Sequence, residues 1–549
     1  MATIDWIVLA LYILLIIVMS WWIGRRQKSQ EDYYLGGRAM PAWQIALSIM
    51  ATQVSAISLI GAPAFIALKG NGGLVWLQYE FAIPLAMMLI MLVLVPLYHK
   101  TRAITIYEYL EKRFGKLTRL SISAVFLISR GLGSGVALLA TSIVTAVCLQ
   151  WPLWETILLI GVVSIVYTTF GGIVADIYSD IIQLVILWGG SILSIIILAG
   201  LLDGESFSLL FQEEARLQVF DFSSTGLGDG QTFAFWPMII GGLFLYLSYY
   251  GCDQSQAQRL LTTSTPGEAQ KALMINGLLR FFLVLTYCAL GVMLIPFLLS
   301  HPEFAATLDD KQPDFLVPYF LIEYIPRGLL GILIAGFFAA SMSSIDSALN
   351  SLSAATYQDF LLTISTRLSR ISDKKQVLIS RMLTIFWGLI ATGFALQMIG
   401  GPETVLELVN KIGSAFYGPI LAVFWLGMLT RRGREVGAII GLLAGVGFNI
   451  YLWQFYGSEV SWLWWNVFGF CITFGLGYLL SLFFGQTALQ EGFILSKQDL
   501  KMYLKDRRYY WILLGVFLFI ILASYLLQEV LKHGQEFFKI DDHQIRART

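Results

Sequence analysis

Long apolar runs, each close to the length that crosses a lipid bilayer, are the feature that most constrains this chain. A bilayer core needs about 20 consecutive apolar residues in a helix, and such runs recur from the first residues almost to the last. Charged residues make up only 13% of the 549 residues, whereas soluble proteins carry about 25%. We therefore predict an all-α polytopic membrane protein. This composition excludes a soluble multidomain protein, a disordered protein or a nucleic-acid binder.

The positions of these runs give the predicted spans. We predict fourteen of them, approximately over 4–24, 41–68, 73–98, 118–149, 153–171, 175–201, 233–252, 268–299, 322–357, 376–399, 404–429, 434–454, 461–485 and 509–531. Lys and Arg gather in alternate loops, around residues 25–38, 100–119, 367–381, 431–434 and 497–508. Because basic loops stay in the cytoplasm, both termini are expected outside, in a multi-pass protein of the plasma (inner) membrane.

The loops between the spans are too short for a soluble catalytic domain. The longest, 202–232, is acidic and is expected outside. The 4 cysteines and 4 histidines show no spacing typical of a disulfide framework or a metal site. The chain is therefore not expected to be an enzyme.

Two predicted spans contain residues that interrupt a helix at mid-depth. Segment 41–68 combines several hydroxyls with Pro63, and segment 233–252 contains the pair Gly241 and Gly242. Lipid cannot satisfy the backbone groups that such residues free, so these stretches are expected to line a cavity or bind a ligand. The alternative is close packing of small residues between helices.

These two segments are the second and seventh predicted spans, as in an inverted repeat of five plus five helices. No repeat is visible in the sequence itself, so this interpretation depends on the broken helices. The chain would then divide into an extra N-terminal helix and loop (1–40), a first half (41–201), an outer loop (202–232), a second half (233–430), and C-terminal helices with a short tail (431–549).

The richest polar stretch within a predicted span is 339–351. Its residues Ser343, Asp346, Ser347 and Asn350 are three and four positions apart, so they share one helix face. Hydroxyls and carboxylates are hard oxygen ligands, which suit a small hard cation. The pattern therefore favours a monovalent-ion site. The alternative is a serine-rich packing face whose hydroxyls bond back to the helix carbonyls.

Charged residues inside the predicted spans are costly unless they are paired or functional. They are Glu80, Arg130, Asp180, Asp253, Arg280, Asp346 and Lys411. Asp180 and Asp253 stand near the ends of their spans, where an interfacial position is an equally simple explanation. Arg130 is the natural partner for a carboxylate solute, with a structural ion pair as the equal alternative.

Five motifs resemble, in the same order, those of the sodium:solute symporter family, which includes sodium/glucose, iodide, monocarboxylate, multivitamin, proline and sialic acid transporters. The motifs lie at 32–43, 107–114, 167–183, 253–259 and 339–351. The last of these, the serine-rich helix, is the strongest match. The resemblance covers roughly residues 5 to 485.

The resemblance implies a leucine-transporter-like fold in which the predicted spans two to eleven form the inverted repeat. It also implies a sodium site between the broken second span and the ninth. The backbone carbonyls of Ala51, Val54 and Ala340 would bind Na⁺ together with the hydroxyls of Ser343 and Ser344.

Some members of the family hold a second sodium ion. The matching positions here are Asp180, Ser343, Asp346 and Ser347. The family pattern has serine at the position of Asp346. This departure would either strengthen the second site or turn it into a proton or single-ion site.

The resemblance also implies substrate positions at Ser55, Ser58, Gln78, Glu80, Tyr246, Tyr249 and Asn410. Tyr249 resembles a gate aromatic that stacks on sugars, and Glu80 resembles a sugar-binding glutamate. Ser58, however, replaces an expected amide. The motif at 253–259 is more similar to the monocarboxylate, iodide and multivitamin branch, for which Arg130 would supply the cation.

We accordingly expect a secondary active transporter that carries a small organic solute, a sugar or an organic acid, into the cell with sodium by alternating access. Its expected partners are the solute, Na⁺ and the lipid bilayer, without nucleic acid or an obligatory protein partner. A proton-coupled symporter is the nearer alternative. A solute-gated channel or sensor on the same scaffold is the more distant one.

Overall fold

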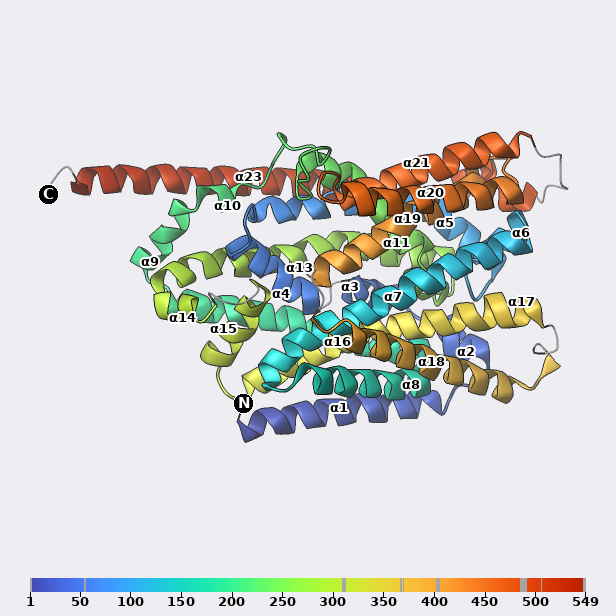
Figure 1. The fold of residues 1–549 in the computed structure, drawn as a ribbon, viewed down its shortest axis with the longest axis horizontal. Coiled ribbons are helices and arrows are strands. Elements are labelled where there is room, and N and C mark those ends of the chain that lie inside the picture. The colour runs from blue at the N-terminus through green and yellow to red at the C-terminus, as the bar shows by residue number, and fades with distance from the viewer. Residues whose placement is uncertain are drawn as a thin grey trace.

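The apolar runs form helices that pack side by side in one elongated bundle (Figure 1). The computed structural model describes residues 2–53, 56–308, 313–365, 368, 370–400, 405–483, 491–504 and 506–546. Within these residues, β structure is limited to one bridge between Leu227 and Val460. The prediction of an all-α, multi-pass membrane protein is therefore confirmed.

Eleven of the described helical segments are long and apolar enough to cross a membrane. They contain the helices α1 (Thr3–Gly24), α5 (Ile83–Thr101), α7 (Lys116–Leu149), α8 (Leu153–Leu201), α13 (Pro266–Ser300), α16 (Leu329–Ala355), α18 (Asp373–Gln397), α19 (Val405–Leu429), α20 (Glu435–Tyr456), α21 (Trp462–Ser481) and α23 (Arg507–Arg546). A bent pair, α3 (Ala42–Gln53) with α4 (Ala56–Ala67), makes a twelfth if it is taken as one span.

The count differs from the fourteen predicted spans at two places. Predicted spans 153–171 and 175–201 lie within the single element α8, which has 49 residues. Predicted span 233–252 becomes the short apolar helix Pro237–Cys252. Its first turn is a π-helical turn that starts at Pro237, which has no backbone N–H to donate.

Helix α8 contains a sharp break at Gly172, whose φ of 56° and ψ of −161° are not helical. Before the break, α8 runs alongside α1 in the same direction. The ring centroids of Trp6, near the start of α1, and Trp151, just before α8 begins, are 5.4 Å apart. At the other end of α1, a Cβ on Gly24 would touch the carbonyl of Phe170.

Beyond the break, the chain returns toward the start of α1. Gly190 of α8 lies against the side chain of Leu333 in α16, and Gly331 of α16 lies against Asp5 of α1. Residues 153–171 and the residues that follow Gly172 are therefore antiparallel to one another.

The predicted interruption in 41–68 is present in the fold, whereas the one predicted in 233–252 is displaced, because Gly241 and Gly242 have helical backbone angles. Helices α3 and α4 are bent by 53° relative to one another. The second interruption lies between α11 (Gly242–Cys252) and α12 (Gln254–Leu261), where Asp253 adopts an extended backbone conformation. At the second break, the carbonyl of Cys252 accepts a hydrogen bond from the hydroxyl of Tyr107 at 3.3 Å.

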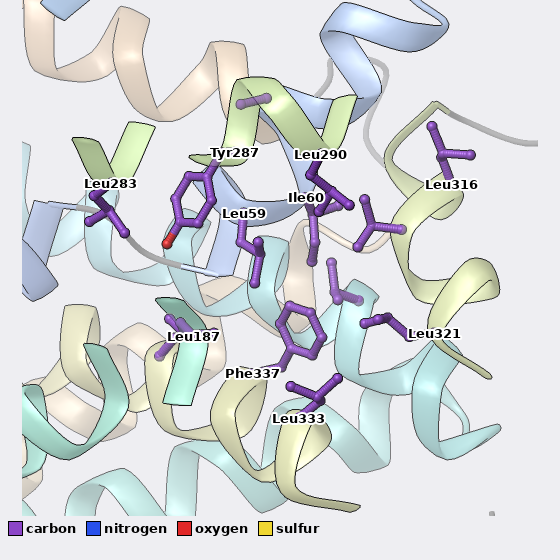
Figure 2. Close-up of a cluster of buried hydrophobic side chains, with 14 of the residues drawn as sticks. Leu59, Ile60, Leu187, Leu283, Tyr287, Leu290, Leu316, Leu321, Leu333 and Phe337 are labelled. Atoms are coloured by element: carbon purple, nitrogen blue, oxygen red, sulfur yellow. The ribbon is translucent and has the colours of Figure 1, made fainter. Parts of the chain in front are cut away.

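One large apolar cluster packs the helices around the first break (Figure 2). Its labelled side chains come from α4, α8, α13, α15 (Leu316–Tyr324) and α16, and they are Leu59, Ile60, Leu187, Leu283, Tyr287, Leu290, Leu316, Leu321, Leu333 and Phe337. Helices α13 and α4 approach so closely that a Cβ on Gly291 would lie 2.9 Å from the Cα of Pro63. Such contact between small residues is typical of membrane helix pairs.

The ends of the bundle differ in what they carry (Figure 1). The start of α1 and the end of α23 lie toward the same end. Helices α2 (Gln30–Leu35), α6 (Glu108–Arg113) and α17 (Leu362–Ile364), next to the basic loops, lie toward the opposite end. This arrangement agrees with the alternation of basic loops in the sequence.

Candidate functional site

A cavity of about 150 Å³ lies inside the bundle, between the two helix breaks. It is bordered by α3, α7, α11, α16, α19 and the short helix η2 (Leu74–Glu80). Its polar and aromatic lining is Thr52, Gln53, Tyr79, Ser129, Arg130, Ser134, Tyr246, Tyr249, Asp253, Ser344, Asn410 and Tyr417. Arg130 and Asp253 are the charged members of this lining.

The structure brings four of the predicted substrate residues to this cavity. They are Arg130, Tyr246, Tyr249 and Asn410. Ser58, Gln78 and Glu80 are not part of the cavity lining. Ser55 lies outside the described residues.

Glu80 forms a buried ion pair with Arg280 of α13. Arg280 donates from Nε to Glu80 Oε2 at 2.9 Å and from Nη2 to Oε1 at 3.1 Å. Arg280 also donates to Gln53 Oε1 at 2.5 Å. Both carboxylate oxygens of Glu80 are therefore engaged within the protein.

Gln78 also has a structural role. Its Nε2 donates to the Val75 carbonyl at 3.3 Å, and its Oε1 accepts from the backbone N–H of Asp221 at 3.4 Å. Gln78 thus ties η2 to the loop that precedes α11.

The aromatic lining of the cavity is fixed by hydrogen bonds at its edges. Tyr246 donates to the Tyr79 carbonyl at 3.0 Å. The hydroxyl of Tyr249 accepts from Gln256 Nε2 at 3.0 Å, and its ring lies 5.9 Å from that of Tyr417. Tyr249 therefore presents a ring face and a positioned hydroxyl close to the second helix break.

Arg130 has donor capacity left over at the cavity wall. Its Nη1 lies 3.8 Å from Asp253 Oδ2, which is an ion pair but too long for a hydrogen bond. Its Nε is buried and has no hydrogen-bond partner. An unpaired buried donor costs about 1–3 kcal/mol, so the Arg130 side chain on the cavity wall keeps a donor that the described residues leave unsatisfied.

The predicted main sodium ligands lie where α3 and α16 meet. Ser344 lines the cavity together with Thr52, the residue after Ala51. Ser343 is fully buried, as are Ala51 and Ala340. Val54 lies outside the described residues, so its carbonyl is not placed.

Ser343 also connects this region to a buried carboxylate of α8. Its hydroxyl donates to Asp180 Oδ1. The other oxygen of Asp180 accepts from Ser48 at 2.5 Å. The sequence analysis did not single out Ser48, because a lone serine within an apolar span carries no distinctive pattern.

Arg259 of α12 supplies the positive charge beside Asp180. Its Nη2 lies 2.8 Å from Asp180 Oδ2, 3.1 Å from Asp176 Oδ2 and 2.5 Å from Ser347 Oγ. The side chains of Arg259 and Asp180 are both 0% exposed. The structure thus brings together Asp180 and Ser347 as predicted, with a guanidinium between them that sequence reasoning missed.

Asp346 has a different hydrogen-bond partner from Asp180. Its Oδ1 accepts from Thr168 of α8 at 2.9 Å, and its Oδ2 is buried without a hydrogen-bond partner. No hydrogen bond joins it to Asp180 among the described residues. Among the described residues, Asp346 therefore shares no hydrogen bond with the set that Asp180 forms with Arg259 and Ser347.

Comparison with known proteins identifies the scaffold. The sodium:solute symporter family matches residues 33–445. The sodium-coupled monocarboxylate transporter 1 of Xenopus laevis is 29% identical over 466 residues, which cover 83% of this chain and 72% of the relative. The sodium/sialic acid symporter NanT of Aliivibrio fischeri is 28% identical over 486 residues, covering 88% of this chain and 94% of the relative.

The fold is also similar to a solved one. The substrate-bound, outward-open structure of a Na⁺-coupled sialic acid symporter matches with a TM-score of 0.78 at 24% identity, covering 88% of this chain and 98% of that one. The prediction of sodium-coupled solute symport, and not enzymatic catalysis, is confirmed by the family match and the relatives. A polytopic helical bundle with a polar cavity beside broken helices is an arrangement that many secondary transporters share. The chain belongs to the sodium:solute symporter family.

Proposed function

We propose that this protein carries a short monocarboxylate, such as lactate, propionate or acetate, into the cell together with sodium. The observation that supports this substrate class is the buried Nε of Arg130, which has no partner and belongs to a side chain on the cavity wall. Guanidinium groups recognise carboxylates through paired, charge-assisted hydrogen bonds.

Three further observations favour a short carboxylate over a neutral sugar. Glu80, the residue that resembles a sugar-binding glutamate, is engaged by Arg280. The cavity of about 150 Å³ is smaller than the ~300–1,000 Å³ typical of sites for drug-sized ligands. The relatives named for monocarboxylates and for sialic acid both act on carboxylic acids.

We propose that sodium binds at Ala51, Val54, Ala340, Ser343 and Ser344. The place of Ser344 on the cavity wall, next to Thr52 of the broken span, supports a sodium ion close to the solute. An ion there would favour the state that binds solute, and rocking of the helices around the site would then expose both to the cytoplasm.

For the second candidate position, at Asp180, Asp346 and Ser347, we propose that Arg259 takes the place of an ion. Arg259 already contacts Asp180 and Ser347. A sodium ion there would have to displace a fully buried guanidinium. We therefore expect one sodium per solute.

We also propose the finer topology. Counting α8 as two crossings and the short helix Pro237–Cys252 as one more raises the twelve spans to fourteen. The breaks at 53–56 and at Asp253 then occupy equivalent positions in a five-plus-five inverted repeat. The end of the bundle that carries the basic loops would face the cytoplasm of the plasma membrane, with both termini outside.

The test is uptake into proteoliposomes that contain the purified full chain. Radiolabelled lactate should accumulate when an inward sodium gradient is imposed and not when choline replaces sodium at fixed pH. Labelled glucose should not accumulate under the same conditions. Sodium-dependent uptake of glucose but not of lactate would overturn the proposed substrate class.

A further inference from the structure

One ion pair spans the cavity between Arg130 of α7 and Asp253, the residue between α11 and α12. The two groups are 3.8 Å apart, with side-chain exposures of 15% and 3%. The other buried pairs described above are shorter, at 2.9 Å for Arg280–Glu80 and 2.8 Å for Arg259–Asp180. The Arg130–Asp253 pair is thus an attraction without a hydrogen bond, inside the substrate cavity.

The two oxygens of Asp253 have different surroundings. Oδ1 accepts from the Ser255 backbone N–H at 2.8 Å and from its hydroxyl at 2.6 Å, which caps the N-terminus of α12. Oδ2 is the oxygen that faces Arg130. The cap holds Asp253 in place, while the charge of its second oxygen compensates the guanidinium.

From this geometry, and given the proposed carboxylate substrate, we propose that Asp253 is a resident counter-anion that the substrate displaces from Arg130. Before substrate binds, the carboxylate of Asp253 compensates the charge of Arg130 but leaves the Nε–H donor of the guanidinium without a hydrogen-bond partner. A monocarboxylate that forms direct hydrogen bonds to the guanidinium replaces this long ion pair with a closer one. A neutral solute has no charge with which to compete, so Asp253 acts as a specificity-determining residue.

The displaced charge also has a structural consequence. Helix α12 carries Asp253 at its N-terminus and Arg259 further along, and Arg259 donates to the Ser255 carbonyl at 2.7 Å. Once the substrate holds Arg130, Asp253 is a buried carboxylate without its cation, which is unfavourable. Substrate binding would therefore loosen the α11–α12 junction on the side that leads to Asp180.

The substitution Asp253→Asn distinguishes the two roles of Asp253, its negative charge beside Arg130 and its hydrogen bonds at the N-terminus of α12. Asparagine keeps an oxygen for the Ser255 N–H and is as good an N-cap residue as aspartate, but it removes the negative charge. We expect the affinity of the purified protein for L-lactate, measured by titration calorimetry in saturating sodium, to rise several-fold, because a like charge beside the bound carboxylate has been removed. Transport turnover should fall as release slows.

Two further variants complete the experiment. Asp253→Ser, which also supplies a capping oxygen without charge, should show the same gain in affinity if Asp253→Asn does not fold. Asp359→Asn is the matched control, since it removes a carboxylate from the buried pair with Arg119, 2.7 Å apart and outside the cavity lining. It should leave lactate affinity unchanged.

The outcomes distinguish this inference from the substrate class on which it rests. Lactate binding by the wild type together with unchanged or weakened binding by both Asp253 variants would overturn the counter-anion role alone. A wild type that binds no short monocarboxylate in sodium would instead overturn the proposed function.

Discussion

The guanidinium of Arg259 lies 2.8 Å from Asp180 Oδ2, at the position where the sequence suggests a second sodium ion. Both side chains are 0% exposed, and Ser48, Ser343 and Ser347 complete the set of hydroxyls around them. On the proposal that Arg259 takes the place of an ion, the protein itself supplies the cation beside Asp180. The number of sodium ions carried with each solute therefore depends on whether the ion pair between Arg259 and Asp180 breaks during transport.

This relationship predicts a Hill coefficient close to one for sodium in the wild-type protein. Asp346→Asn should leave that coefficient unchanged, because Asp346 binds Thr168 and not the Asp180 set. The measurement is the sodium dependence of lactate uptake in proteoliposomes, with the charge-to-solute flux ratio measured in parallel. A wild-type coefficient near two that Asp346→Asn lowers to one would show that sodium does occupy the second position.

The main sodium site is tested by Ser343→Ala and Ser344→Ala. Each substitution removes one hydroxyl and leaves the backbone carbonyls in place. We expect the sodium concentration for half-maximal uptake to rise several-fold, or transport to be lost, with normal insertion in the membrane. Ser194→Ala is a matched control, since Ser194 is a buried serine on α8 whose hydroxyl donates to its own helix at the Gly190 carbonyl, 2.9 Å away. Unchanged sodium dependence in both serine variants would exclude these residues from the site.

The role of Arg130 in carboxylate binding is tested by Arg130→Gln. Losing one partner of a charged, hydrogen-bonded pair costs about 2 kcal/mol or more, which corresponds to roughly thirtyfold weaker lactate binding. Arg130→Lys should restore only part of the affinity, because an ammonium group cannot form the paired contact. Lactate affinity that stays at the wild-type value in Arg130→Gln would mean that Arg130 serves only to pair with Asp253.

Packing of the Tyr249 ring against the solute is tested by comparing two substitutions at that position. Tyr249→Ala should weaken substrate binding by about 1 kcal/mol, because the apolar contact between the ring and the methyl group of lactate is lost. Tyr249→Phe should be mild, since it removes only the hydroxyl that accepts from Gln256. Equilibrium binding of lactate measures both. Equal losses in the two variants would show that the hydroxyl, and not the ring, is what matters.

The sequence predicted those features that depend on local pattern. Apolar runs predict spans because each helix must satisfy its own backbone in lipid, and the spacing of Ser343 and Ser347 predicts a shared polar face. The partners of the buried charges could not be predicted in this way. Glu80 and Arg280 are 200 residues apart in sequence, and only the packed bundle shows that they neutralise one another.

Asp180 illustrates the same limit within the candidate site. Its depth in the bundle and its oxygen-rich surroundings are those of an ion ligand. Arg259, however, lies on a short helix after a break, outside the predicted spans, so no intramembrane cation was expected near Asp180. The reversal within α8, by contrast, falls between the predicted spans 153–171 and 175–201, although no polar loop marks it in the sequence.

That reversal at Gly172 determines the sidedness of everything after it. A Cβ at this position would lie 2.6 Å from the Tyr33 carbonyl, and the positive φ is one that glycine alone adopts readily. If the chain did not reverse direction at Gly172, α8 would cross the bilayer once instead of twice. Every later loop would then emerge from the opposite face of the bilayer, and its basic residues would stand where the acidic ones belong. With α8 counted as two crossings, Gly172 thus determines on which side of the membrane each later loop lies.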